Sequence, residues 1–231
     1  MSDIDMGKRK MKLTIFGATG GIGRQLVEQA MAAGHAATAV VRNPRNLPGG
    51  IQIVTAELSA ANRATLESAV RGADAVLSGL GPRALTKAGI AAEGTRAIVQ
   101  AMKATDVRRI VVVSAAPIGT VASPHRPNPP KHDPGDGFFM RHLFSHVAGA
   151  LFGKVYTDLA QMEDVLRDSG LDWTVVRPPR LSSKPGTGRY RTAYSQNVRG
   201  GWIVPRADVA QLMLRAVGQP ETIKQVIGVA S

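Results

Sequence analysis

Three glycines near the start of the chain have the spacing of a phosphate-binding turn. The stretch TIFGATGGIGR, residues 14–24, places Gly17, Gly20 and Gly23 after a short apolar run and before an amphipathic one. Such glycines permit a sharp turn, let backbone N–H groups approach a pyrophosphate, and let the helix pack closely on the strand. The helix N-terminus adds partial positive charge. No Gly-Lys-Ser/Thr follows, so the pattern favours a dinucleotide site over a phosphoryl-transfer loop; a turn that binds nothing is the alternative.

The end of the second apolar run indicates which dinucleotide is held. NAD-binding proteins place an acidic residue there to accept hydrogen bonds from the ribose hydroxyls. This chain has VVRNPRN instead, with Arg42 in that place, Arg45 close by and no acid. A guanidinium donates to a 2′-phosphate that a carboxylate would repel. The sequence therefore predicts NADP(H) over NAD(H), with an ordinary surface arginine as the alternative.

The elements that must position these residues alternate along the chain. Strands are expected at 12–16, 37–41, 51–55, 74–78, 109–114, 172–178 and 224–230. Helices are expected at 22–33, 59–71, 88–104, 155–169 and 208–217. The strand runs lack polar alternation, which indicates burial on both faces of a parallel sheet. We expect an α/β fold, a Rossmann-type doubly wound parallel sheet, as a single domain over 12–231 behind a flexible leader, 1–11.

A long insert, 117–154, separates the fifth strand from the next helix. It opens with PIGTVASPHRPNPPKHDPGDG and contains four of the five Phe and four of the five His. A loop of this length is usually a lid or a binding loop. Phe138 and Phe139 begin an apolar stripe that we expect to cover a substrate or to enter a partner subunit. His142 and His146 are one turn apart, but no HExxH pattern accompanies them, and no metal is expected.

Composition excludes several classes of protein. The net charge is +12, but the basic residues are scattered and no aromatic residues interleave them, so nucleic acid is not an expected partner. No cysteine is present, which excludes disulfides and thiolate zinc sites and fits the cytoplasm. No apolar stretch approaches the roughly 18 residues of a membrane span. A small-molecule acceptor is the expected partner, and both a monomer and a homodimer remain open.

Five segments together resemble one family: GATGGIG, VRNPRNLP, GLGPR, AAEGTRAIVQAMKATDVRRIVVVS and MEDVLRDSGLDWTVVRPPRL. In this order they are similar to atypical short-chain dehydrogenase/reductase proteins with NAD(P)-binding, NmrA-like domains, which include flavin reductases. The resemblance covers about 12–116 and 156–217. The resemblance implies that the pyrophosphate of the cofactor lies at Gly17, Thr19, Gly20, Gly21, Ile22 and Gly23, and the 2′-phosphate at Arg42. It implies that Glu57 and Leu58 border the adenine, and that Leu80, Gly81 and Arg83 run along the ribose and diphosphate. The nicotinamide would lie at Ser114, Ala115, Pro178 and Pro179.

The chain departs from the family pattern at its catalytic positions. Typical members pair a Tyr with a Lys four residues later, but Tyr156 is followed by Ala160. Two histidines of the flavin reductases are replaced here by Leu159 and Arg180. Ser114 and Tyr156 remain candidate catalytic groups, and Arg180 could face an anionic substrate. Each of these residues also has an interpretation without a functional role: Ser114 as a serine at a strand end, Tyr156 as a tyrosine packed at the edge of a cleft, and Arg180 as an exposed arginine.

These features lead to two functional hypotheses. The first is an NADPH-dependent reductase that transfers a hydride to a planar conjugated acceptor, such as a quinone or a flavin (FMN or FAD as substrate rather than prosthetic group). Such chemistry belongs mainly to the cofactor and needs no Tyr–Lys pair. The second is a redox sensor that binds NADP(H) and regulates a partner without turnover. Fold alone does not decide between the two.

Overall fold

The computed structural model describes residues 9–44, 47–58, 63–81, 89–136 and 149–231. Strands run over β1 Lys12–Phe16, β2 Ala36–Val41, β3 Gln52–Thr55, β4 Ala75–Ser78, β5 Arg109–Val113, β6 Asp172–Arg177, β7 Arg180–Ser182, β8 Arg191–Tyr194, β9 Ile203–Pro205 and β10 Gln225–Ala230. Helices are α1 Gly21–Ala32, α2 Arg63–Val70, α3 Ile90–Ala104, α5 Gly149–Asp168 and α6 Arg206–Val217, with short 3₁₀ helices η1 Ala116–Thr120 and η3 Pro220–Thr222.

The central sheet has eight strands in the order β3-β2-β1-β4-β5-β6-β10-β8. All neighbouring strands pair in parallel except β8, which pairs antiparallel with β10 at one edge. The strand order reverses between β1 and β4. In such sheets, ligands bind at this switch point, beyond the carboxyl ends of the strands.

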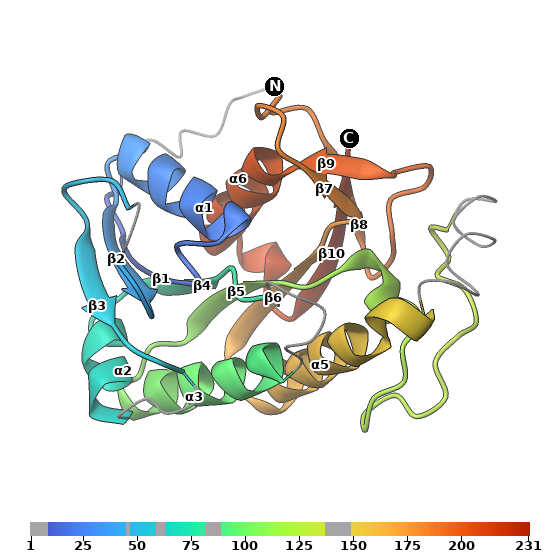
Figure 1. Cartoon of the computed structure of the whole chain (residues 1–231), viewed down its shortest axis with the longest axis horizontal. Helices are drawn as coiled ribbons and strands as arrows, with labels where there is room; N and C mark the ends of the chain where they lie inside the picture. The colour runs from blue at the N-terminus through green and yellow to red at the C-terminus, as the bar shows by residue number, and fades with distance from the viewer. Residues whose placement is uncertain (1–8, 45–46, 59–62, 82–88, 137–148) are drawn as a thin grey trace.

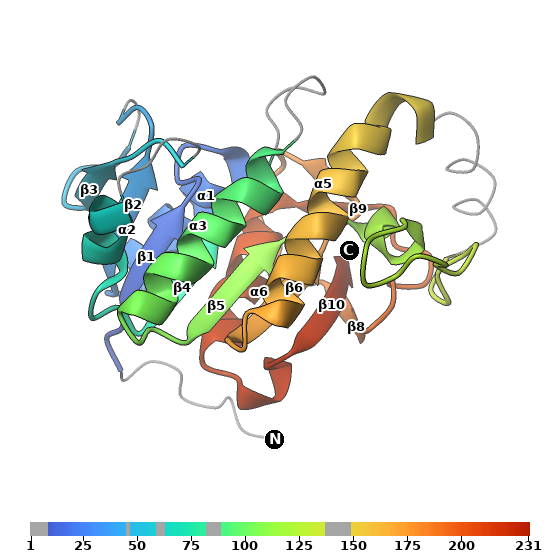
Figure 2. The same cartoon turned by 90° about the horizontal axis from the view of Figure 1, so that it is seen from below.

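Helices cover both faces of the sheet (Figure 1): α1 and α6 lie on one face, and α2, α3 and α5 lie on the other. Figure 2 shows α3 and α5 lying side by side across the second face. Each face carries its own buried core, so that in β1 Leu13 and Ile15 belong to the core beneath α1, whereas Phe16 belongs to the core beneath α3. This two-sided burial explains why the strand sequences are continuously apolar.

The predicted fold class is confirmed, and the predicted strands of the central sheet agree with the structure to within one residue at either end. Strands β7, β8 and β9 were not predicted. They are short and partly exposed, so their sequences lack the apolar run that marks the central strands. In the structure, β7 pairs in parallel with β9 as a separate two-stranded sheet.

The predicted insert differs from expectation at both ends. Its start forms η1, followed by a β-bridge between Ser123 and Arg126. Helix α5 begins at Gly149, six residues before the predicted start at 155, and takes up the end of the insert. Phe138, Phe139, His142 and His146 lie outside the described residues, as do residues 1–8 of the predicted leader.

Candidate functional site

The glycine turn after β1 has the tight geometry that a dinucleotide cradle requires. Gly17 has a φ of +70°, and a side chain there would also come within 2.9 Å of the carbonyl of Gly79. Gly20 donates its N–H to the Gly17 carbonyl at 2.8 Å and caps α1. A Cβ at Gly23 would lie 2.1 Å from the Gly17 oxygen. The strand, turn and helix can therefore approach this closely only with glycine at both positions.

The N-terminus of α1 lies at the glycine turn. No side chain caps the helix within the described residues, and its first turn carries no acidic residue. The first N–H groups of a helix have no acceptor within the helix, and the helix dipole gives them partial positive charge. The arrangement is suited to a phosphate group.

The residues predicted to border the adenine and ribose follow β3 and β4, which β2 and β1 separate in the sheet. Leu58 after β3 and Leu80 after β4 both pack over Gly94 of α3, at about 3 Å from where a Cβ of that glycine would lie. Glu57, Gly81 and Arg42 are exposed. Arg45 and Arg83 lie outside the described residues.

The four residues predicted at the nicotinamide follow β5 and β6, which are adjacent strands. Two backbone hydrogen bonds hold the segments together beyond the strands. The N–H of Ser114 donates to Val176 at 2.8 Å, and the N–H of Ala116 donates to Pro178 at 2.9 Å. Ala115 and Pro178 are therefore brought to the same edge of the sheet.

A buried charged cluster underlies this edge, and the sequence analysis missed it. Glu163 of α5 is fully buried and accepts hydrogen bonds from Arg177 Nε at 2.9 Å and Nη2 at 2.6 Å. Arg167 Nη2 donates to it at 3.0 Å, and the Ser114 hydroxyl at 2.8 Å. Arg177 ends β6 directly after an apolar pair of valines; a charge beside such a run was the available signal, because buried charges need partners.

Glu163 is held in its ionised form. Burial by itself would raise the pKa of Glu163, but the positive charge and hydrogen bonds of Arg177, the charge of Arg167 and the hydrogen bond from Ser114 outweigh it and lower the pKa. The hydroxyl proton of Ser114 is engaged in the hydrogen bond to Glu163. Toward a ligand, the hydroxyl oxygen of this candidate catalytic group could therefore only accept a hydrogen bond.

Tyr156 lies half-buried on α5, against the core beneath α3. Burial raises the pKa of Tyr156, so its phenol is a weaker acid than usual. The residue one turn later, Ala160, is 1% exposed and belongs to the core. In the Tyr–Lys pair of typical short-chain dehydrogenases a lysine lowers the tyrosine pKa; here the environment acts in the opposite direction.

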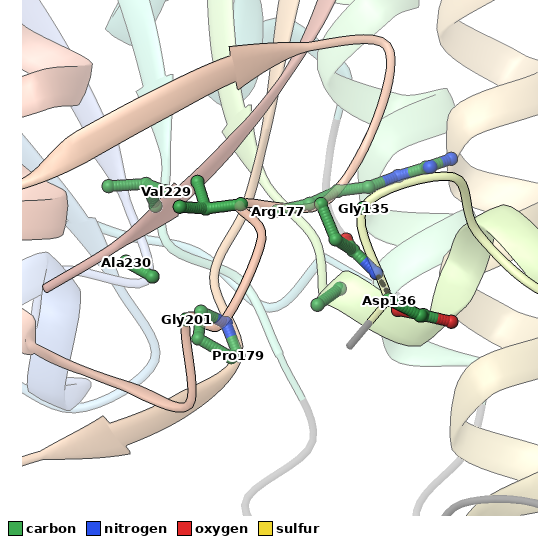
Figure 3. A pocket seen from close by; sticks show the side chains of 10 residues that line it. Gly135, Asp136, Arg177, Pro179, Gly201, Val229 and Ala230 are labelled. Atoms are coloured by element: carbon green, nitrogen blue, oxygen red, sulfur yellow. Dashed lines mark hydrogen bonds between the residues drawn. The ribbon is translucent and has the colours of Figure 1, made fainter. Parts of the chain in front are cut away.

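A small cavity lies beside the predicted nicotinamide edge (Figure 3), with Gly135 and Asp136 on one side and Gly201 and Ala230 on the other. Its volume of about 10 Å³ holds roughly one water molecule. One wall comes from the start of the insert, where the buried Asp133 accepts a hydrogen bond from the N–H of Asn197 at 2.8 Å. The cavity is too small for an aromatic ring system.

The remaining expectations concern Arg180, metal ligands and membrane-spanning helices. Arg180 is exposed, with its backbone N–H donating to Trp202 at 3.3 Å. Within the described ranges, no group of three or more His, Asp or Glu side chains could hold a metal ion. No helix in that part of the chain is long and apolar enough to cross a membrane.

A family model described as NAD(P)H-binding matches residues 17–220, which is most of the chain. The protein belongs to this NAD(P)H-binding family. The match begins at Gly17, the first glycine of the turn. The cradle described above fits such a cofactor, because Gly17 and Gly23 allow the close backbone approach and α1 presents an uncapped N-terminus. The predicted NADP(H) cofactor is confirmed at the level of an NAD(P)H-binding family, and its individual contact residues remain predictions.

Three proteins illustrate what this chain is similar to in sequence or in fold. A chloroplastic protein of Arabidopsis thaliana is 26% identical over 95% of this chain and 76% of its own length. A 3-diazoavenalumate denitrifying reductase from a Streptomyces species is 30% identical over 78% of this chain and 59% of its own. The anaerobillin reductase ChuY of Escherichia coli O157:H7 has the same fold, with a TM-score of 0.73 at 21% identity over 95% of this chain and 96% of its own.

Proposed function

We propose that the protein is an NADP(H)-dependent reductase that transfers a hydride to a planar conjugated acceptor, such as a quinone or a flavin. One observation carries this proposal: the dinucleotide cradle is intact, whereas the place of the relay lysine is taken by a buried Ala160. Reductases among the similar proteins support it. The cytoplasm remains the predicted compartment.

The chain's own residues have a limited task in such a reaction. The bound cofactor supplies the hydride. The glycine turn and the N-terminus of α1 hold the pyrophosphate, and Ala115, Pro178 and Pro179 flank the nicotinamide. A conjugated acceptor spreads the charge that it receives over its rings and takes its proton from water. An activated tyrosine is therefore unnecessary, which agrees with the raised pKa of Tyr156.

Arg42 should decide the choice of cofactor. Arg42→Ala removes a charge-assisted contact to the 2′-phosphate, a loss of roughly 1.5–3 kcal/mol. We expect NADPH to bind about 10- to 100-fold more weakly, with NADH binding unchanged, in titrations followed by nucleotide fluorescence. Arg71→Ala, an exposed arginine in the turn after α2, is the matched control. Wild-type protein that binds NADH as tightly as NADPH would contradict the assignment.

A panel of acceptors separates the reductase from the sensor. The protein is mixed with NADPH and, in turn, a flavin, a quinone and a small carbonyl compound, and nicotinamide absorbance is followed against protein-free mixtures. We expect steady oxidation with the flavin or the quinone and none with the carbonyl compound, which needs a proton donor. NADPH binding without oxidation by any acceptor would instead support the sensor.

A further inference from the structure

Arg206 lies at the glycine turn although it is distant from it in sequence. It is the first residue of α6, and α6 packs beside α1 (Figure 1). Its side chain crosses Gly21, the first residue of α1: a Cβ on Gly21 would lie 2.6 Å from both Cδ and Nε of Arg206. Besides the pyrophosphate contact that the resemblance implies, glycine at position 21 leaves the space that the Arg206 side chain occupies.

The guanidinium of Arg206 keeps most of its hydrogen-bonding capacity. Its Nη1 donates to the Ser183 hydroxyl at 2.9 Å. None of the ion pairs formed within the described ranges includes Arg206. Residues 178–206 contain no Asp or Glu. An arginine has five N–H donors, so several remain for an anion.

We propose that Arg206 binds the pyrophosphate of NAD(P)H at the glycine turn, from the side of α6. The N-terminus of α1 offers backbone N–H groups and partial charge, and a guanidinium beside it adds a full charge and paired donors that match phosphate oxygens. Arg42 would hold the 2′-phosphate and Arg206 the diphosphate, so the two arginines act on different parts of one ligand. The proposal rests on the cofactor of the family and does not depend on the acceptor.

Nucleotide fragments test the assignment directly. Dissociation constants for NADPH, NADH and adenosine 2′-monophosphate are measured by calorimetry for wild type, Arg206→Ala and Arg42→Ala. For Arg206→Ala we expect NADPH and NADH to bind at least about tenfold more weakly, and the monophosphate, which lacks a pyrophosphate, to bind unchanged. For Arg42→Ala we expect weaker NADPH and monophosphate binding and unchanged NADH binding. Arg199→Ala, an exposed arginine of the same segment, should leave all three constants within about twofold.

A second variant separates charge from packing. Arg206→Gln keeps a side chain over Gly21 and a donor for Ser183 but carries no charge. We expect it to lose as much affinity as the alanine variant, with thermal unfolding of the free protein close to wild type. Recovery of wild-type affinity by glutamine, or constants for Arg206→Ala equal to those of Arg199→Ala, would overturn the proposal. If wild type itself bound neither dinucleotide, the proposed function would fall with it; if wild type oxidised NADPH while Arg206→Ala bound it normally, only this proposal would fall.

Discussion

Glu163→Ala should lower the free energy of unfolding by about 3–5 kcal/mol, because the substitution leaves Arg177 buried without its carboxylate partner. Urea denaturation followed by circular dichroism measures the change. Ser114→Ala is the matched control: it removes one hydrogen bond to the same carboxylate and leaves both arginines paired, at a cost of about 1–3 kcal/mol. Equal, small losses in the two variants would show that the ion pair is not what holds α5 to β6.

The same carboxylate sets a dependence on pH. The folded-state pKa of Glu163 is lowered relative to the unfolded chain, where a glutamate titrates near about 4.3. Its contribution to stability is therefore complete above that value and is lost as the pH falls through the folded-state pKa. In acid titrations of stability, the difference between wild type and Glu163→Gln should shrink across this range. A constant difference would mean that Glu163 is already neutral in the folded protein.

Gly23→Ala should weaken NADPH binding by at least about tenfold and destabilise the fold by about 1–3 kcal/mol. The added Cβ would meet the Gly17 oxygen at 2.1 Å and its carbonyl carbon at 2.7 Å. Both are backbone atoms, so no change of rotamer relieves the contact and the turn itself must move. Fluorescence titration and urea denaturation of one preparation measure both effects.

Gly153→Ala is the matched control for this substitution. Gly153 lies within α5, and among the described residues nothing beyond its chain neighbours and the backbone of its own helix lies within 4 Å of its Cβ position. Alanine there should leave NADPH binding unchanged and add up to about 1 kcal/mol of stability, because glycine is the poorer helix former. Wild-type affinity in Gly23→Ala would contradict the role given to the turn.

Sequence reasoning located the parts of the site that depend on local pattern. The glycine spacing follows an apolar run, so the strand, turn and helix at 12–33 could be predicted from neighbouring residues alone. The family resemblance implied Leu80, Ala115 and Pro178 as cofactor contacts, and these residues follow β4, β5 and β6 in the structure. The rule that ligands bind beyond the carboxyl ends of parallel strands points to the same positions.

The residues that were missed depend on contacts between distant segments. The sequence places Arg177 at the end of an apolar run, but only the packing of α5 on the sheet shows that Glu163 is its buried partner. Arg206 reaches Gly21 because α6 returns to lie beside α1, almost a full chain length later. Strands β8 and β9 are partly exposed, and tertiary pairing rather than an apolar pattern determines them.

The most direct test of the proposed function is anaerobic mixing of the protein with equal amounts of NADPH and FMN, with flavin absorbance followed over time. Hydride transfer inside the site predicts that the flavin is bleached at a rate proportional to protein concentration, with one NADPH consumed per flavin, and that Tyr156→Phe bleaches it at a similar rate. Bleaching no faster than in the protein-free mixture, by protein that demonstrably binds both NADPH and FMN, would contradict the account.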